Sequence, residues 1–121
     1  MRRLLAIMAC VLPTVAEAEI ITCTFTEPFV TTTYSTTQST LTAKYETESR
    51  EEVLTHISFQ ILGPGHFELW DADRRPVHRL DLSHKGSDGM SERRYPYEAH
   101  WTSKGVRGGC SSTHLPVKQP N

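Results

Sequence analysis

The sequence has no excess of charge of either sign, few aromatic residues and no long apolar run. Its 13 lysines and arginines stand against 14 aspartates and glutamates, for a formal net charge of -1. This balance argues against a general polyanion binder, because no basic surplus is available to displace counterions from nucleic acid. Aromatic residues form 8% of the chain, too few for a long platform that stacks single strands. The length of 121 residues predicts a single domain.

The motifs that mark common catalytic and metal sites are also missing. The chain contains no G-x-S-x-G, H-E-x-x-H or S-x-x-K motif. Six histidines are present without the helical or paired-cysteine spacing of a zinc site: His56, His66, His78, His84, His100 and His114. We therefore predict a protein that is not an enzyme and holds no metal or cofactor. The alternative is a small exported enzyme with a cryptic site assembled across strands.

The first 18 residues are typical of a secretory signal peptide. Residues 1–3 are a short basic start, residues 4–15 are mostly apolar, and residues 16–18 read Ala-Glu-Ala, as a signal peptidase requires. We expect cleavage between Ala18 and Glu19, which places a soluble mature chain in the periplasm or outside the cell. The apolar run is shorter than the roughly 20 residues of a membrane span, so we expect no transmembrane segment in the mature chain.

The cysteine count agrees with export. Cys10 lies in the predicted signal peptide, so cleavage leaves only Cys23 and Cys110. An even pair in an exported protein predicts a disulfide, which for a loop of this span stabilises the fold by about 4–5 kcal/mol in the chain-entropy model. An alternative remains at Cys10, because residues 7–10 resemble a bacterial lipobox that would make the protein a lipoprotein anchored at this cysteine.

Residues 19–110 alternate between apolar and polar side chains with the period of two that is typical of β-strands. Inward-facing positions are predicted in four segments: Ile21, Cys23 and Phe25; Val30, Thr32 and Tyr34; Leu41, Ala43 and Tyr45; and Val53, Thr55, Ile57, Phe59 and Ile61. The last segment is the longest alternating run, so we expect it to be a central strand. Gly63-Pro64-Gly65 should end it, because glycine accepts positive φ and proline cannot donate to a ladder.

The next two segments form a hairpin whose register can be predicted. If the numbers of paired residues sum to 147, Phe67 lies opposite Leu80 on one face. The same register places Glu68 opposite Arg79 on the other face, which is a favourable charge pair. Because the two faces agree, we expect this register in the folded protein.

The last strands are expected to return the chain to its start. Tyr95, Tyr97, Ala99 and Trp101 share one face of a strand in which Pro96 removes a donor, and this predicts an edge position or a bulge. A short final strand near Val106 should carry Cys110 back to Cys23. The fold class is therefore all-β, a small antiparallel β-barrel or sandwich of seven to eight short strands closed by one disulfide. The expected parts are a signal peptide at 1–18, a β domain at 19–110 and a flexible tail at 111–121.

One segment resembles a known sequence pattern. Residues 86–97 read G-S-D-G-M-S-E-R-R-Y-P-Y and are followed by Gly109-Cys110. They resemble the tail of small uncharacterised exported proteins and lipoproteins of Gram-negative bacteria, whose pattern runs C-S-D-G-M-S-D/E-R-x-Y-P-Y before a strand and G-C. This chain has Gly86 in place of the first cysteine of that pattern. The resemblance therefore implies that Cys110 has no local partner and pairs with Cys23.

The same segment supplies a candidate recognition loop, whose members are Asp88, Ser91, Arg93, Arg94, Tyr95 and Trp101. Asp88 is expected to accept from the loop amides and to pair with Arg93 or Arg94. The loop is either structural or a contact surface, since Tyr, Trp and Arg are enriched at binding hot spots. We predict a non-catalytic periplasmic binding or envelope-accessory protein. In its sharper form it is an inhibitor of an exported hydrolase such as lysozyme, by fold-level similarity to membrane-bound lysozyme inhibitors.

Overall fold

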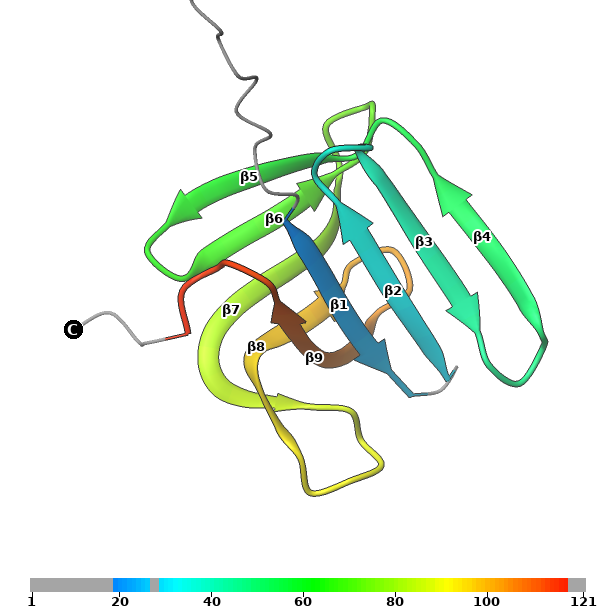
Figure 1. The fold of residues 1–121 in the computed structure, drawn as a ribbon, viewed down its shortest axis with the longest axis vertical. Helices are drawn as coiled ribbons and strands as arrows, with labels where there is room; N and C mark the ends of the chain where they lie inside the picture. The colour runs from blue at the N-terminus through cyan, green and yellow to red at the C-terminus, as the bar shows by residue number, and fades with distance from the viewer. Residues whose placement is uncertain (1–18, 27–28, 118–121) are drawn as a thin grey trace, which may run out of the picture.

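The computed structural model describes residues 19–26 and 29–117, which form β-strands and turns (Figure 1). The strands in these ranges are β1 (Ile20–Phe25), β2 (Val30–Ser35), β3 (Thr40–Tyr45), β4 (Arg50–Leu54), β5 (Ser58–Gly63), β6 (His66–Trp70), β7 (Pro76–Ser87), β8 (Arg94–Trp101) and β9 (Val106–Ser112). No helix in the described ranges is long and apolar enough to cross a membrane. The predicted signal peptide, including Cys10 and Ala18, lies outside the described residues, so cleavage and the lipobox stay predictions.

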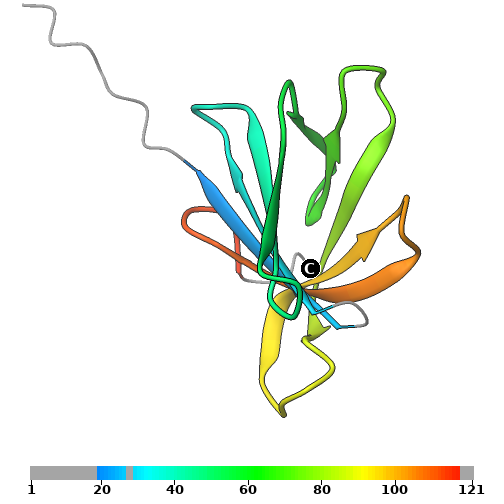
Figure 2. The ribbon, with the colours of Figure 1, turned by 90° about the vertical axis from the view of Figure 1, so that its right-hand side faces the viewer.

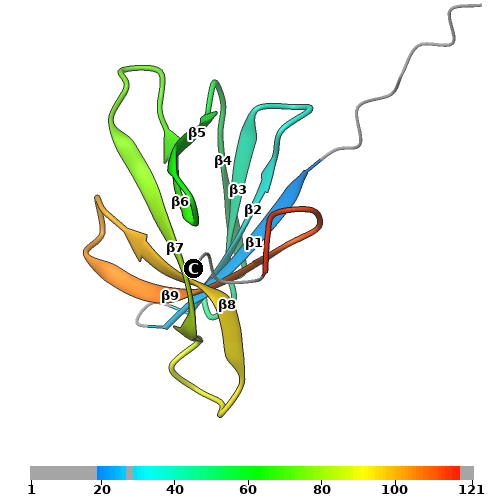
Figure 3. The same cartoon turned by 90° about the vertical axis from the view of Figure 1, so that its left-hand side faces the viewer.

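The strands form one antiparallel sheet in the order β4-β3-β2-β1-β9-β8-β7-β6-β5. The first and last strands are therefore neighbours in the middle of the sheet, whereas β4 and β5, which are consecutive in sequence, are its two edges. Figures 2 and 3 show that the sheet curls strongly and brings its two halves face to face. The all-β antiparallel prediction is confirmed. The prediction of seven to eight strands in a closed barrel or sandwich is wrong, because the described residues form nine strands in one open sheet.

The opening of the sheet lies where a single central strand was predicted. The alternating run from Val53 to Ile61 is divided between the two edge strands, because His56 adopts a φ of 58° and turns the chain between them. The crossing is anchored by Ile57, whose amide donates to the Ser39 carbonyl at 2.9 Å and whose side chain is buried. The central-strand prediction is thus wrong. Alternation identifies a strand but does not distinguish an edge from a centre.

The core fills the concave side of the sheet and contains the predicted inward positions of the first three strands. These are Ile21, Cys23, Phe25, Val30, Thr32, Tyr34, Leu41, Ala43 and Tyr45, all of which are buried. The chain breaks after Gly63, as predicted, and Gly65 follows with a φ of 74°. Local alternation therefore determines the buried side of β1, β2 and β3. It fails at the edge strands, where Val53 and Ile61, both predicted to face inward, are 59% and 69% exposed.

The β6–β7 hairpin has the predicted register. Phe67 lies opposite Leu80 and Glu68 opposite Arg79, and Arg79 Nε donates to Glu68 Oε2 at 2.8 Å. In β8, Pro96 does not lie at an edge, because β8 pairs with β7 on one side and β9 on the other. The β7–β8 pairing shifts register between the Leu82 and Gly86 pairs. Pro96 falls in this irregularity, so the bulge alternative is the correct one.

The disulfide joins the two central neighbours, β1 and β9. Cys23 and Cys110 lie directly opposite one another, with Cα atoms 4.1 Å apart and a sequence separation of 87. The predicted pairing is confirmed, but the bond clasps the middle of an open sheet instead of the seam of a barrel. The β9 strand runs to Ser112, two residues past the expected domain boundary, and Leu115 packs against the core.

Candidate functional site

The candidate loop, residues 88–93, joins β7 to β8 and is organised around the Asp88 carboxylate, so it is named the Asp88 loop. Asp88 Oδ1 accepts from the Met90 amide at 2.9 Å and the Ser91 amide at 2.8 Å. Its Oδ2 accepts from Ser91 Oγ at 2.8 Å and the Tyr95 hydroxyl at 3.3 Å. These bonds, led by the one from the Ser91 amide, lower the pKa of Asp88 to about 2. The carboxylate therefore holds the loop in one shape and stays ionised at neutral pH.

Two glycines allow the loop to pack closely on the sheet. Gly89 has a φ of 77°, and a Cβ atom there would lie 2.6 Å from Thr26 Oγ1. A Cβ atom on Gly86 would lie 2.1 Å from the Tyr97 carbonyl oxygen. A side chain at position 86 would therefore require the backbone of β7 or β8 to move.

The loop exposes an apolar side chain, two cationic ones and the carboxylate of Glu92. Met90 is 59% exposed, and Arg93 and Arg94 are exposed as well. The Arg93 guanidinium lies 4.8 Å from the centre of the Tyr95 ring. The ion pairs found among the described residues do not include the predicted one between Asp88 and an arginine. Two backbone amides and the Ser91 and Tyr95 hydroxyls occupy the carboxylate instead, and both arginines stay exposed at the surface.

The two aromatic members of the predicted loop are buried and are not exposed to a binding partner. Tyr95 is buried and donates to Asp88, so it supports the loop from beneath. Trp101 is 2% exposed and lies at the opposite end of β8 from the loop. The structure therefore brings Asp88, Ser91 and Tyr95 together as a scaffold and places the two arginines outside it.

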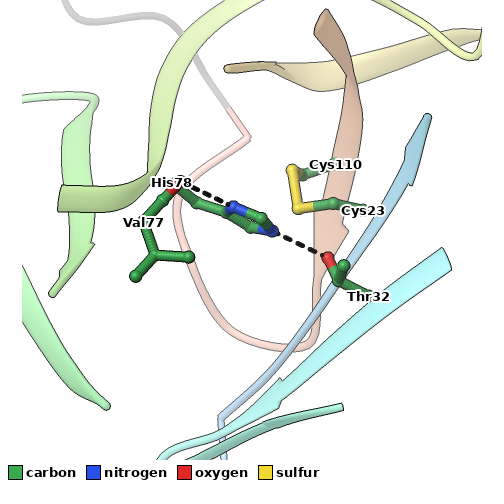
Figure 4. Close-up of a disulfide and its surroundings, with 5 residues drawn as sticks. All are labelled: Cys23, Thr32, Val77, His78 and Cys110. Carbon is green, nitrogen blue, oxygen red and sulfur yellow. Dashed lines mark hydrogen bonds between the residues drawn. A yellow bond between two sulfur atoms is a disulfide. The ribbon is translucent and has the colours of Figure 1, made fainter. Parts of the chain in front are cut away.

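A buried histidine beside the disulfide was not singled out from the sequence. His78 is 0% exposed, and Figure 4 shows its ring lying between Val77 and Thr32, next to the Cys23–Cys110 bond. Its Nδ1 is 3.0 Å from the Val77 carbonyl, so Nδ1 carries the proton, and Nε2 accepts from Thr32 Oγ1 at 2.9 Å. Burial lowers the pKa of His78 to about 4. The sequence does indicate the inward position of His78. It precedes the inward-facing Leu80 by two residues, so the two side chains lie on the same face of the strand.

One histidine and one carboxylate lie within hydrogen-bond reach on the convex side. His66 Nδ1 is 2.5 Å from Asp81 Oδ1 across the β6–β7 hairpin. Both side chains are more than half exposed, and they border a shallow hollow of about 460 Å³ that contains no serine, threonine or cysteine. This pair is the arrangement that an enzyme site across strands would have to use. Among the described residues, no group of three or more His, Cys, Asp or Glu side chains could hold a metal ion.

A second hollow, of about 550 Å³, lies where the β6–β7 and β8–β9 turns approach β4. Charges of both signs border it, from Glu52, Asp71, Arg75 and Lys104. The Lys104 ammonium lies 5.1 Å from the centre of the Trp101 ring. Within the described part of the chain, every buried side-chain nitrogen or oxygen has a hydrogen-bond partner. In the described residues, no buried polar atom without a partner therefore points to a ligand in this hollow.

Comparison with known proteins found no match, whether among protein-family models, curated proteins or solved structures. The similarity of residues 86–97 to exported proteins stays a prediction.

Proposed function

We propose that this chain is an exported, non-catalytic binding protein that contacts a protein or another component of the cell envelope through the Asp88 loop. The observation that carries the proposal is the saturation of Asp88 by its own loop, with Arg93 and Arg94 left outside. A loop that is already ordered loses little conformational entropy when it binds. Methionine and arginine, the residue types it exposes, are enriched at protein interfaces.

The disulfide supports export, because disulfides form and persist mainly in oxidising compartments. Cys23 and Cys110 are both buried and lie within a regular strand pair. The basic and apolar start of the sequence supports the same location. The proposed site of action is the periplasm or the outside of the cell.

The sharper form of the proposal is inhibition of an exported glycoside hydrolase such as lysozyme. These enzymes work with a pair of carboxyl groups that flank the scissile bond. Arg93 and Arg94 are adjacent, exposed and free of the Asp88 carboxylate, so they complement an acidic cleft of this kind. Met90 at the tip of the loop supplies an apolar contact beside them.

Titration of lysozyme with the exported protein tests this form, with binding followed by calorimetry and inhibition by cell-wall hydrolysis. We expect Arg93→Ala/Arg94→Ala to weaken binding by at least about tenfold, and added salt to weaken the wild type. The matched control is Arg75→Ala/Lys104→Ala, which removes two exposed cations at the far end of the sheet. Equal losses in the two double variants would contradict a role for the loop.

The wider proposal is tested by capture from an envelope extract on immobilised protein. A partner held by the wild type and by the control, but lost with Arg93→Ala/Arg94→Ala, supports the loop as the binding surface. If wild type and loop variant retain the same proteins, the loop is structural only.

The second candidate function is catalysis at the His66–Asp81 pair, which is favoured only by their contact of 2.5 Å. Both side chains are well exposed, so water screens the interaction. A panel of ester, glycoside and peptide substrates would test it. Hydrolysis that is lost in His66→Ala and retained in Arg93→Ala/Arg94→Ala would replace the binding proposal with an enzymatic one.

A further inference from the structure

The two edges of the open sheet differ sharply in charge. The β4 edge begins with Arg50, Glu51 and Glu52, and the Arg50 guanidinium bonds Glu52 at 2.9 Å. The β5 edge, with the sequence S-F-Q-I-L-G, contains neither a charged residue nor a proline. Sheet edges in native proteins are protected from pairing by charges, prolines or bulges. The β4 edge therefore carries charges on the first three of its five residues, and β5 carries none.

The β5 edge also exposes large apolar side chains on both of its faces. Ile61 is 69% exposed and borders a hollow of about 470 Å³ with Phe67, Leu115 and Pro116. Leu62 is 56% exposed and borders the separate hollow beside His66. In Figure 1, β5 is the last strand on its side of the sheet, with β6 as its neighbour. Its outer backbone groups and these side chains are therefore open to a further strand.

The β5–β6 pairing shifts between the Ile61 and Gly63 pairs, and Pro64 follows directly. This irregularity limits the regular, unprotected part of the edge to residues 58–61. Four residues make few hydrogen bonds, so a stable contact must also cover the apolar hollow around Leu115. The partner strand must accordingly be short, uncharged and apolar.

We propose that β5 pairs antiparallel with β5 of a second copy of this chain, which joins two sheets across a two-fold axis. β5 is itself short, uncharged and rich in apolar residues, as its partner strand must be. An antiparallel pair of identical strands is also self-complementary. A head-to-tail contact between β5 and β4 would instead set Arg50, Glu51 and Glu52 beside an uncharged edge. Because those charges disfavour further addition at β4, the assembly stops at two copies.

This surface is distinct from the Asp88 loop. The loop joins β7 to β8, and the hollows that border β5 contain none of its residues. Pairing through β5 therefore leaves Arg93 and Arg94 exposed, and a dimer presents two loops. Failure of dimerisation and failure of loop binding are separate experimental outcomes.

Sedimentation equilibrium of the exported protein from about 1 μM to about 1 mM tests the proposal. We expect the wild type to approach twice the monomer mass and Ile61→Lys to stay monomeric, since pairing would bury an unpaired ammonium. Val53→Lys is the matched control, because Val53 is a β-branched residue on the other edge and is 59% exposed. Its dissociation constant should equal that of the wild type. Thermal unfolding of each variant shows whether it is folded.

Amide exchange locates the contact independently. In the dimer, amides of residues 58–61 should gain protection as the protein concentration rises, whereas those of β4 should not. A wild type that stays monomeric at about 1 mM overturns the proposal. Val53→Lys that dissociates the dimer as strongly as Ile61→Lys, or assemblies larger than two, would overturn it as well.

Discussion

Thr32 and His78 hydrogen bond across the core, with 2.9 Å between Oγ1 and Nε2, although their strands β2 and β7 are not neighbours in the sheet. The bond joins the two halves of the curled sheet beside the disulfide (Figure 4). It requires neutral His78, because Nε2 must accept from the hydroxyl while Nδ1 donates to Val77. Protonation would remove the acceptor and place a charge in the core.

Stability should therefore fall on mild acidification. The pKa of His78 is about 4 in the folded chain and about 6.5 when unfolded, so the unfolded state takes up the proton first. The free energy of unfolding should drop by about 3 kcal/mol as the pH falls from 6.5 through 4. Urea denaturation at several pH values measures this loss. His78→Gln should reduce the pH dependence and His100→Gln should retain it; equal slopes in the two variants would contradict the assignment.

The Asp88 loop should respond to acid in a different range. Because the pKa of Asp88 is about 2, its hydrogen bonds persist well below the range in which His78 titrates and are lost only as the pH falls through about 2. Asp88→Asn removes the negative charge to which the Met90 and Ser91 amides donate, and it replaces Oδ2, the acceptor of the Ser91 and Tyr95 hydroxyls, by a donor. Exchange of the Met90 and Ser91 amides should therefore accelerate at neutral pH. Asp81→Asn, which changes an exposed carboxylate outside the loop, is the control. Unchanged exchange in Asp88→Asn would show that the carboxylate does not organise the loop.

Removal of the disulfide should act first in the middle of the sheet. Cys23→Ala/Cys110→Ala is expected to lower the free energy of unfolding by about 2–5 kcal/mol. Amides in the β1–β9 ladder should lose protection before those in the β7–β8 ladder, because only the former pair is clasped by the bond. Hydrogen exchange with and without reductant measures the order. Loosening that begins at the β4 and β5 edges would contradict this account.

Phe59 should matter less than its place in a long alternating run suggests. Its ring stacks on Phe67 with centroids 5.3 Å apart, but it lies on an edge strand and is only partly buried. Phe59→Ala should cost about 1–2 kcal/mol. Leu69→Ala, at the fully buried position opposite Phe59, should cost about 2–5 kcal/mol. Thermal or urea unfolding compares the two, and equal losses would place β5 in the core.

Local patterns in the sequence were sufficient for the buried faces of β1, β2 and β3, for the hairpin register and for the disulfide, but not for the edge strands, where Val53 and Ile61 are exposed. Alternation assigns Ile21 or Leu41 to the core without any knowledge of neighbouring strands. The register of Phe67 and Leu80 follows because both faces of the hairpin impose the same pairing. Even the inward position of His78 was available from its phase with Leu80, although its partners were not.

The closure of the sheet could not be obtained in this way. Residues 53–61 alternate regularly, yet the chain turns at His56, whose positive φ has no signature as clear as a glycine. Whether β4 and β5 pair depends on the curvature of all the strands between them. The same limit applies to Asp88, because its bonds to the loop amides were predicted correctly but its additional pair with Arg93 or Arg94 was not. The Ser91 and Tyr95 hydroxyls occupy its second oxygen instead, and only the loop geometry shows this.

The crossing at residues 55–57 separates the chain into β1–β4 and β5–β9, and Cys23 and Cys110 lie on opposite sides of it. A protease that cut at exposed Thr55 or His56 would therefore not release a fragment. It would convert a single polypeptide into a disulfide-linked heterodimer that still shares the β1–β9 ladder and the core. On a denaturing gel the nicked protein would keep the mass of the intact chain without reductant. With reductant it would separate into two peptides.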